Sequence, residues 1–229
     1  MNVSIFHYFC SKIQNVTMRT SVNPTEYRRE LKGRILDVAM REFKKRGIRN
    51  VKMDDIARLL TISKRTLYEI YSDKQTLLLE GISHEENLRQ EQLQAFSRQP
   101  GNGALSVIME FYRTQIKEFS IIDPVFFEDL KRFRVVMDYM RSRHAEHQEK
   151  AAVFFRKGVE EGVFRDDVDY DIISRLGEDA TRFVMESRMY NEYSLEHIFR
   201  NIIFLFVRGF STEKGIKMMD RLLEEGGRI

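Results

Sequence analysis

The sequence predicts an all-α protein, and three observations support this fold class. Only 3 of the 229 residues are Pro and 12 are Gly, so few positions oppose helix formation. Apolar residues recur at spacings of three and four, and the long runs rich in Glu, Lys, Arg and Leu lack the alternation typical of strands. Hydrophobic residues make up 42% and charged residues 32% of the chain, an ordinary composition for a folded, helix-rich protein.

The chain opens with a segment that we expect to be flexible. Residues 1–22 show no helical period, and Met18 offers an alternative start of the protein. The first predicted helix follows over residues 24–46, with one apolar stripe formed by Leu31, Ile35, Val38, Ala39 and Phe43. Three cations occupy its last turn, and Gly47 is expected to end it as a left-handed residue.

Two short helices come next, with almost nothing between them. The first has its apolar stripe at Met53, Ile56, Ala57 and Leu60. After Thr61 and Ile62, Ser63 is a natural N-cap for a helix that ends near Tyr71. Two helices so close must cross sharply, and the small side chain of Ala57 allows this. We therefore predict a helix-turn-helix, the motif that places its second helix in the major groove of DNA.

The second of these helices has distinct inner and outer faces. Its inward face is expected to hold Leu67, Ile70 and Tyr71. Its outward face is expected to hold Lys64, Arg65, Tyr68 and Glu69. Charge supports an anionic partner here, because residues 19–78 hold 15 Lys and Arg against 8 Asp and Glu, whereas residues 79–229 hold 22 against 27. We expect Lys64 or Arg65 to read the groove and Tyr68 to contact a phosphate.

The rest of the chain predicts longer helices. A capping box, Ser72 to Gln75, opens one that reaches about residue 98. Further helices are expected at residues 104–120, 124–131, 133–161, 168–190, 195–210 and 212–225, with Asp123 and Ser194 as N-caps. We divide the chain into the segment 1–22, a helix-turn-helix domain over 23–72, and a larger helical domain over 73–229.

Residues 28–80 resemble the N-terminal domain of the tetracycline-repressor (TetR/AcrR) family. The resemblance rests on Asp55-Ile56-Ala57, Ser63-Lys64, Thr66-Leu67-Tyr68, Tyr71 and Lys74. It implies that Ser63, Lys64, Thr66 and Tyr68 lie at the DNA and that Lys74 meets a phosphate at a helix N-terminus. Three positions depart from the family pattern. Thr61 replaces a glycine in the turn, Lys52 replaces a threonine near a phosphate, and Arg65 replaces a glycine, adding a possible contact.

The resemblance also implies an effector pocket and a two-fold dimer. The C-terminal part is rich in Phe, Met and Tyr, and we expect a pocket among Phe111, Phe126, Phe155 and Met185. Most such residues are core in any helical protein. The helix at 195–210 is apolar nearly all round, and its neighbour carries small residues. We expect both in a four-helix dimer interface that includes Gly177, Ala180, Ile202 and Ile203; interior helices of a monomer are the alternative.

Other classes of protein find little support. The single cysteine, Cys10, fits a reducing cytoplasm, and the apolar run at 202–207 is too short to span a bilayer. His144 and His147 have a metal-like spacing but no further ligands, so we expect no metal, no cofactor and no catalytic residue. The leading hypothesis is a homodimeric repressor that a small apolar or aromatic effector releases from a palindromic operator. The alternatives are a DNA-binding adaptor that recruits a protein, and an enzyme or carrier.

Overall fold

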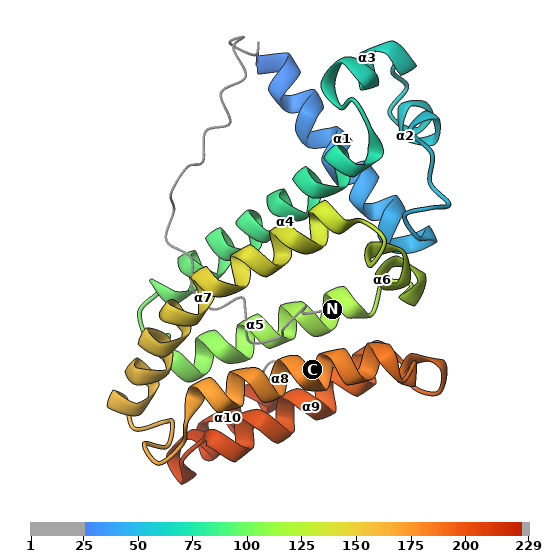
Figure 1. The fold of residues 1–229 in the computed structure, drawn as a ribbon. Helices are drawn as coiled ribbons and strands as arrows, with labels where there is room; N and C mark the ends of the chain where they lie inside the picture. Colours follow the sequence, from blue (N-terminus) through green and yellow to red (C-terminus); the bar gives the residue numbers. More distant parts are fainter. Residues whose placement is uncertain (1–25, 226–229) are drawn as a thin grey trace. The chain divides into compact units, whose positions relative to one another are not determined.

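The computed structural model describes residues 26–225, apart from the side chains of residues 143–150, 178 and 225. The predicted N-terminal segment and the side chains of His144 and His147 therefore lie outside the described residues. Figure 1 shows the helices α1 (Glu26–Arg46), α2 (Met53–Leu59), α3 (Lys64–Ile70), α4 (Lys74–Ser97), α5 (Ala104–Phe119), α6 (Pro124–Leu130), α7 (Arg134–Glu160), α8 (Tyr170–Glu186), η2 (Met189–Asn191), α9 (Leu195–Phe210) and α10 (Glu213–Glu225). The predicted all-α class is confirmed.

These helices form two compact units. The N-terminal unit comprises residues 26–87 and 122–139, and the C-terminal unit comprises residues 88–121 and 140–225. Helices α4 and α7 each contribute residues to both units. Within the described part of the chain, no helix is both long enough and apolar enough to cross a membrane.

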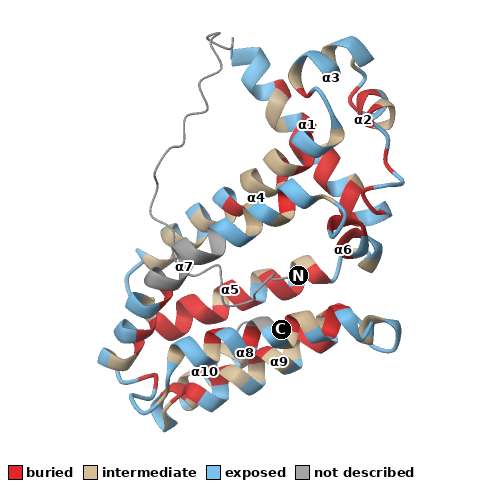
Figure 2. Ribbon diagram, in the orientation of Figure 1, coloured by how far each residue is buried: buried red, intermediate tan, exposed pale blue. Residues whose placement is uncertain are grey.

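Helix α1 supplies the core of the N-terminal unit. Leu31, Ile35, Ala39 and Phe43 of the predicted stripe are buried, as Figure 2 shows for this face of the helix. Gly47 ends the helix with a φ of 81°, the left-handed conformation that its position predicts. A Cβ at this position would lie 2.5 Å from Cγ1 of Val125 in α6. Glycine is therefore required both for the backbone conformation and for the close approach of α6.

The turn between α2 and α3 is strained at one residue. Thr61 has a φ of 56°, a left-handed backbone that favours the glycine usual at this position of the family. The turn is closed by backbone hydrogen bonds from Thr61 to Arg58 (3.1 Å) and from Ile62 to Ala57 (3.0 Å). Ala57, Leu67 and Tyr71 are buried beneath it. A β-branched residue is thus held in an unfavourable conformation by the packing on both sides.

The start of α4 differs from the prediction by one residue. Asp73, not Ser72, is the capping residue: its carboxylate accepts the backbone N–H of Thr76 at 2.8 Å and the hydroxyl of Thr76 at 3.1 Å. The backbone N–H of Thr76 is the main reason that the pKa of Asp73 lies below its ordinary value. Ser72 instead donates its hydroxyl to Asp73 at 3.1 Å. A charged acceptor wins this position because it interacts with the helix dipole as well as with the N–H group.

The C-terminal unit is built around α5. This helix packs against α9 and α10 and is largely buried (Figure 2). Aromatic side chains join α7, α8 and α9, with the Phe155 ring stacked on Tyr170 at 4.4 Å and edge-on to Phe210 at 5.7 Å. Helix α8 ends at Glu186 rather than at the predicted residue 190, because Arg188 adopts a left-handed φ of 55°.

We expect Thr61→Gly to stabilise the protein by about 0.5–1 kcal/mol, since relief of the left-handed strain exceeds the backbone entropy cost of glycine. Urea denaturation measures the change. Arg34→Gly, at an exposed position inside α1, is the matched control and should lower stability by up to about 1 kcal/mol. Equal losses in both variants would contradict the assignment of strain to Thr61.

Candidate nucleic-acid interface

Helix α3 is held by its own cap and by two buried side chains. The hydroxyl of Ser63 accepts the backbone N–H of Thr66 at 3.0 Å, which confirms Ser63 as the N-cap. The hydroxyls of Ser63 and Thr66 also share a hydrogen bond of 2.8 Å. Leu67 and Tyr71 are buried, and Tyr68 is exposed. The cap therefore engages both hydroxyls that the resemblance places at the DNA.

The two cations of α3 are each paired with a carboxylate. Lys64 forms a hydrogen-bonded ion pair with Asp54, in the first turn of α2. Arg65 donates to Glu69, one turn further along α3, at 2.8 Å. Lys64, Arg65 and Glu69 are exposed, with 67% of Lys64 and 88% of Arg65 accessible to solvent, and Asp54 is half-buried. The outward face of the helix is therefore polar and dense in donors and acceptors, but its charge is balanced.

Lys74 has a different place from the one predicted. Its ammonium donates to the backbone carbonyls of Ile48 (2.8 Å), Arg49 (3.4 Å) and Val51 (2.7 Å). These three bonds match the three donors of an ammonium. Burial lowers the pKa of Lys74, an effect that the nearby Asp129 carboxylate opposes. The structure thus uses Lys74 to fix the α1–α2 loop, and the predicted phosphate contact of its ammonium conflicts with these bonds.

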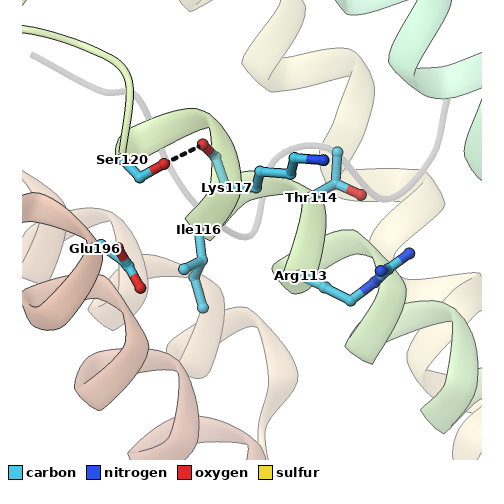
Figure 3. Close-up of a pocket in the computed structure, with 6 residues that line it drawn as sticks. All are labelled: Arg113, Thr114, Ile116, Lys117, Ser120 and Glu196. Carbon is cyan, nitrogen blue, oxygen red and sulfur yellow. Dashed lines mark hydrogen bonds between the residues drawn. The ribbon is translucent and has the colours of Figure 1, made fainter. Parts of the chain in front are cut away.

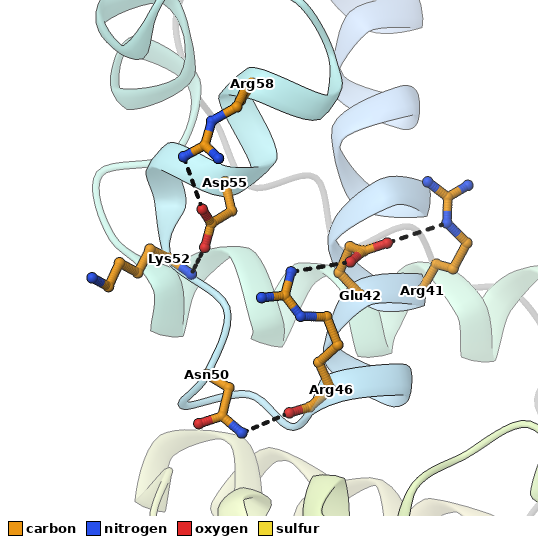
Figure 4. Close-up of polar contacts among 7 residues, drawn as sticks. All are labelled: Arg41, Glu42, Arg46, Asn50, Lys52, Asp55 and Arg58. Carbon is orange, nitrogen blue, oxygen red and sulfur yellow. Dashed lines mark hydrogen bonds and ion pairs between the residues drawn. The ribbon is translucent and has the colours of Figure 1, made fainter.

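The positive charge of the N-terminal unit gathers at the end of α1 and in the loop that follows. We call its exposed cations the basic edge: Arg41, Lys45, Arg46, Arg49 and Lys52. Figure 4 shows Glu42 between two of them, 3.7 Å from Arg41 and 3.5 Å from Arg46.

Lys52 precedes α2, and the network around it involves backbone rather than its ammonium. Its backbone N–H donates to Asp55 at 3.0 Å, and Arg58 donates to the same carboxylate at 3.1 Å (Figure 4). The N–H of Lys52 is the largest cause of the lowered pKa of Asp55. The side chain of Lys52 is exposed, and its contact with a phosphate stays a prediction.

The predicted effector residues are buried but not gathered in one unit. Phe126 belongs to the N-terminal unit, whereas Phe111, Phe155 and Met185 belong to the C-terminal unit. The ring of Phe155 is enclosed by other aromatic rings. Sequence periodicity cannot assign α6 to a different unit from α5, so the grouping of these four residues into one pocket stays a prediction.

A groove of 360 Å³ lies elsewhere in the C-terminal unit. Figure 3 shows its lining from one side of α5 and the first turn of α9: Arg113, Thr114, Ile116, Lys117, Ser120 and Glu196. None of these residues was predicted. The only sequence signal is the spacing of Arg113, Lys117 and Ser120, which places them on one face of α5.

Helices α8 and α9 expose an apolar face. It consists of Ile172, Leu176 and Phe183 of α8 and Leu205 of α9, the last with 73% of its surface accessible. Of the predicted interface residues, Ala180 and Ile202 are partly exposed, whereas Gly177 and Ile203 are buried inside their own unit. Ile203 is therefore a core residue, and Leu205 lies on the face that the sequence predicted to be covered.

Comparison with protein families decides the class of the N-terminal unit. Residues 35–80 match the family model described as "Bacterial regulatory proteins, tetR family". Residues 35–80 belong to the tetR family. The match spans α2, α3 and the start of α4, the elements that build the helix-turn-helix. These residues thus form a TetR-type DNA-binding domain, and the proteins of this family are transcriptional regulators rather than enzymes.

Solved structures extend the similarity in fold to most of the chain. A transcriptional regulator from Saccharomonospora viridis in complex with choline covers 81% of this chain and 100% of its own, at 19% identity and a TM-score of 0.59. A TetR transcriptional regulator from Legionella pneumophila covers 83% and 100%, at 16% identity and a TM-score of 0.55. The ketosteroid regulator KstR2 of Mycobacterium tuberculosis covers 85% and 100%, at 20% identity and a TM-score of 0.52. No curated protein matches the chain.

We expect Lys74→Met to lower the stability of the N-terminal unit by about 1–3 kcal/mol, because three loop carbonyls lose their donor. Urea denaturation measures this. Lys45→Met, which removes an exposed lysine of the same unit, should change stability by less than about 0.5 kcal/mol. Unchanged stability of Lys74→Met together with weaker DNA binding would favour the phosphate contact predicted from the sequence.

Proposed function

We propose that the protein is a homodimeric transcriptional repressor that binds a palindromic operator through α3 and is released by a small-molecule effector. The observation that carries this proposal is the TetR-type helix-turn-helix, whose second helix exposes Lys64, Arg65 and Tyr68. A pair of such helices can read two half-sites one DNA turn apart only if two copies of the chain associate. An operator in the chromosome agrees with the cytoplasmic location expected from the sequence.

The charges of the N-terminal unit favour a division between phosphate and base contacts. The basic edge carries the excess positive charge, and the side chain of Lys52 is exposed beside the start of α2. Such cations supply affinity that depends on salt but not on sequence. The outward face of α3 is charge-balanced and rich in donors and acceptors, which suits the reading of base edges. We assign Lys64 and Arg65 to bases, and Lys52 and the Tyr68 hydroxyl to phosphates.

A footprinted genomic site tests this assignment. Arg65→Ala should weaken binding to that site by about 1–3 kcal/mol and relax the preference for one base pair. Lys52→Ala should instead weaken binding to specific and random DNA alike and reduce the salt slope by about 1. Fluorescence anisotropy over a range of salt concentrations measures both.

Lys217→Ala on α10 is the control for loss of one exposed positive charge. The assignment is wrong if Arg65→Ala and Lys217→Ala bind the footprinted site equally well. The DNA-binding function itself is wrong if no genomic site is footprinted by the intact protein.

The dimer is proposed to form through the apolar face of α8 and α9. The sequence of α9 is apolar nearly all round, so burial on both sides is expected, yet Leu205 is exposed in the single chain. Ile172, Leu176 and Phe183 recur on one side of α8 at helical spacing and are exposed as well. A second copy of the same face would remove these side chains from water.

Leu205→Lys should convert the dimer to a monomer, since a buried charge without a partner opposes association. Light scattering and sedimentation measure the change, and binding to the palindromic site should be lost with it. Val153→Lys is the matched control, because Val153 is also exposed, at 64%, but lies on α7. A Leu205→Lys protein that remains dimeric would place the interface on another surface.

The effector is proposed to bind within the C-terminal unit. Two observations support this: the solved regulator of similar fold that carries choline, and the groove between α5 and α9. A bound molecule can release DNA only if it favours one arrangement of the protein over another. By linkage, the factor by which it weakens operator binding equals the factor by which operator weakens its own binding. Helices α4 and α7 are continuous through both units and are the candidates for transmitting the change.

A further inference from the structure

The ion pair between Lys64 and Asp54 is unusual for a surface that meets DNA. Lys64 begins the recognition helix α3, and Asp54 lies in the first turn of α2. Both side chains are exposed, 67% for Lys64 and 38% for Asp54. The pair therefore joins the two helices of the motif and remains accessible to a partner.

A carboxylate at this place opposes simple attraction to the DNA backbone. It repels phosphates, and it occupies the ammonium that would otherwise neutralise one of them. The phosphates of random DNA attract the ammonium of Lys64 but do not interact favourably with the carboxylate of Asp54. A protein selected only for affinity would gain by replacing this residue with a neutral one.

One kind of base pair suits both members of the ion pair better than the other. In the major groove, guanine presents the N7 and O6 acceptors, which lysine recognises, and the paired cytosine presents the N4 amino donor, which aspartate accepts. A single G·C pair thus presents acceptors to the ammonium and a donor to the carboxylate in the same major groove. An A·T pair also offers acceptors and an amino donor, but adenine places its N6 donor beside the N7 acceptor, where guanine has a second acceptor for the ammonium, and thymine adds a methyl group beside O4.

We infer that Asp54 is a specificity-determining residue, which together with Lys64 reads one G·C base pair in each half-site and weakens binding to other DNA. The inference rests on the proposed DNA-binding function. Asp54 differs in this respect from Glu69, whose pairing with Arg65 stays within one helix. The pair from Asp54 spans α2 and α3, so the two reading groups approach the base pair from two separate elements.

Asp54→Asn tests the inference, with Asp37→Asn as the matched control. Asp37 is an exposed aspartate on α1, so both variants lose one negative charge on the same unit. Anisotropy titrations should use the footprinted duplex, the same duplex with its G·C pairs replaced one at a time, and a random duplex of equal length. We expect Asp54→Asn to lower the ratio of specific to random affinity about 10-fold, and Asp37→Asn to leave that ratio unchanged.

The replaced duplexes identify the base pair. With the intact protein, one symmetric G·C position should cost about 10-fold or more when changed to A·T, and Asp54→Asn should lose that preference. In a Lys64→Gln background, Asp54→Asn should have no larger effect on the ratio than Asp37→Asn, because the reading pair is already broken.

Two results would overturn the inference. Equal ratios in Asp54→Asn and Asp37→Asn would show that the carboxylate reads nothing. If Asp54→Asn instead lowers the affinities for the footprinted and random duplexes equally and also lowers the melting temperature, the ion pair only stabilises the packing of α2 against α3. Failure of the proposed function is distinguishable from both, because the intact protein would then bind the footprinted and random duplexes equally.

Discussion

The helix-turn-helix depends on the attachment of the α1–α2 loop to the rest of the N-terminal unit. Helices α2 and α3 have seven residues each, too few to be stable alone. The Lys74 ammonium binds three loop carbonyls, and the Asp129 carboxylate accepts the backbone N–H of Arg49 at 2.8 Å. Gly47 lets α6 approach the same loop. Charged side chains of α4 and α6 thus form hydrogen bonds with backbone groups of the α1–α2 loop. This attachment positions α2.

This attachment leaves other side chains to meet DNA. Because Lys74 is engaged by the loop, the proposed function gives the phosphate contacts to the basic edge, which includes Lys52. Carboxylates pair with three cations of this edge, as they do with the cations of α3. The proposal therefore gives structural, phosphate-binding and base-reading roles to separate cations within a stretch of only 34 residues, 41–74.

Local rules predicted the helices and several of their ends, whereas pairings over longer distances were not predictable. The left-handed Gly47 and the N-cap Ser63 depend on their neighbours in sequence, and both were predicted. The contacts of Lys74 and Asp54 depend on which elements the fold brings together. Lys74 binds the carbonyl of Val51, 23 residues earlier in the sequence, and Asp54 pairs with Lys64 across the turn between α2 and α3. The sequence placed Ile203 in the dimer interface, but Ile203 is buried in the single chain and Leu205 is exposed, because helical spacing does not show which side of α9 the same chain covers.

The balanced charge of the recognition face also suits a regulator that must be released. Coupling between an effector and DNA is typically worth about 1–3 kcal/mol, a factor of about 5–150 in affinity. The proposed effector would bind in the C-terminal unit and would not alter phosphate attraction, so release of this size is effective only if that attraction contributes little of the binding free energy. Each ion pair on the recognition face that must be broken on binding lowers the contribution of phosphate attraction to the binding free energy. In the proposed dimer, the affinity that remains then depends on the correct placement of two recognition helices, which a change in the arrangement of the dimer would alter.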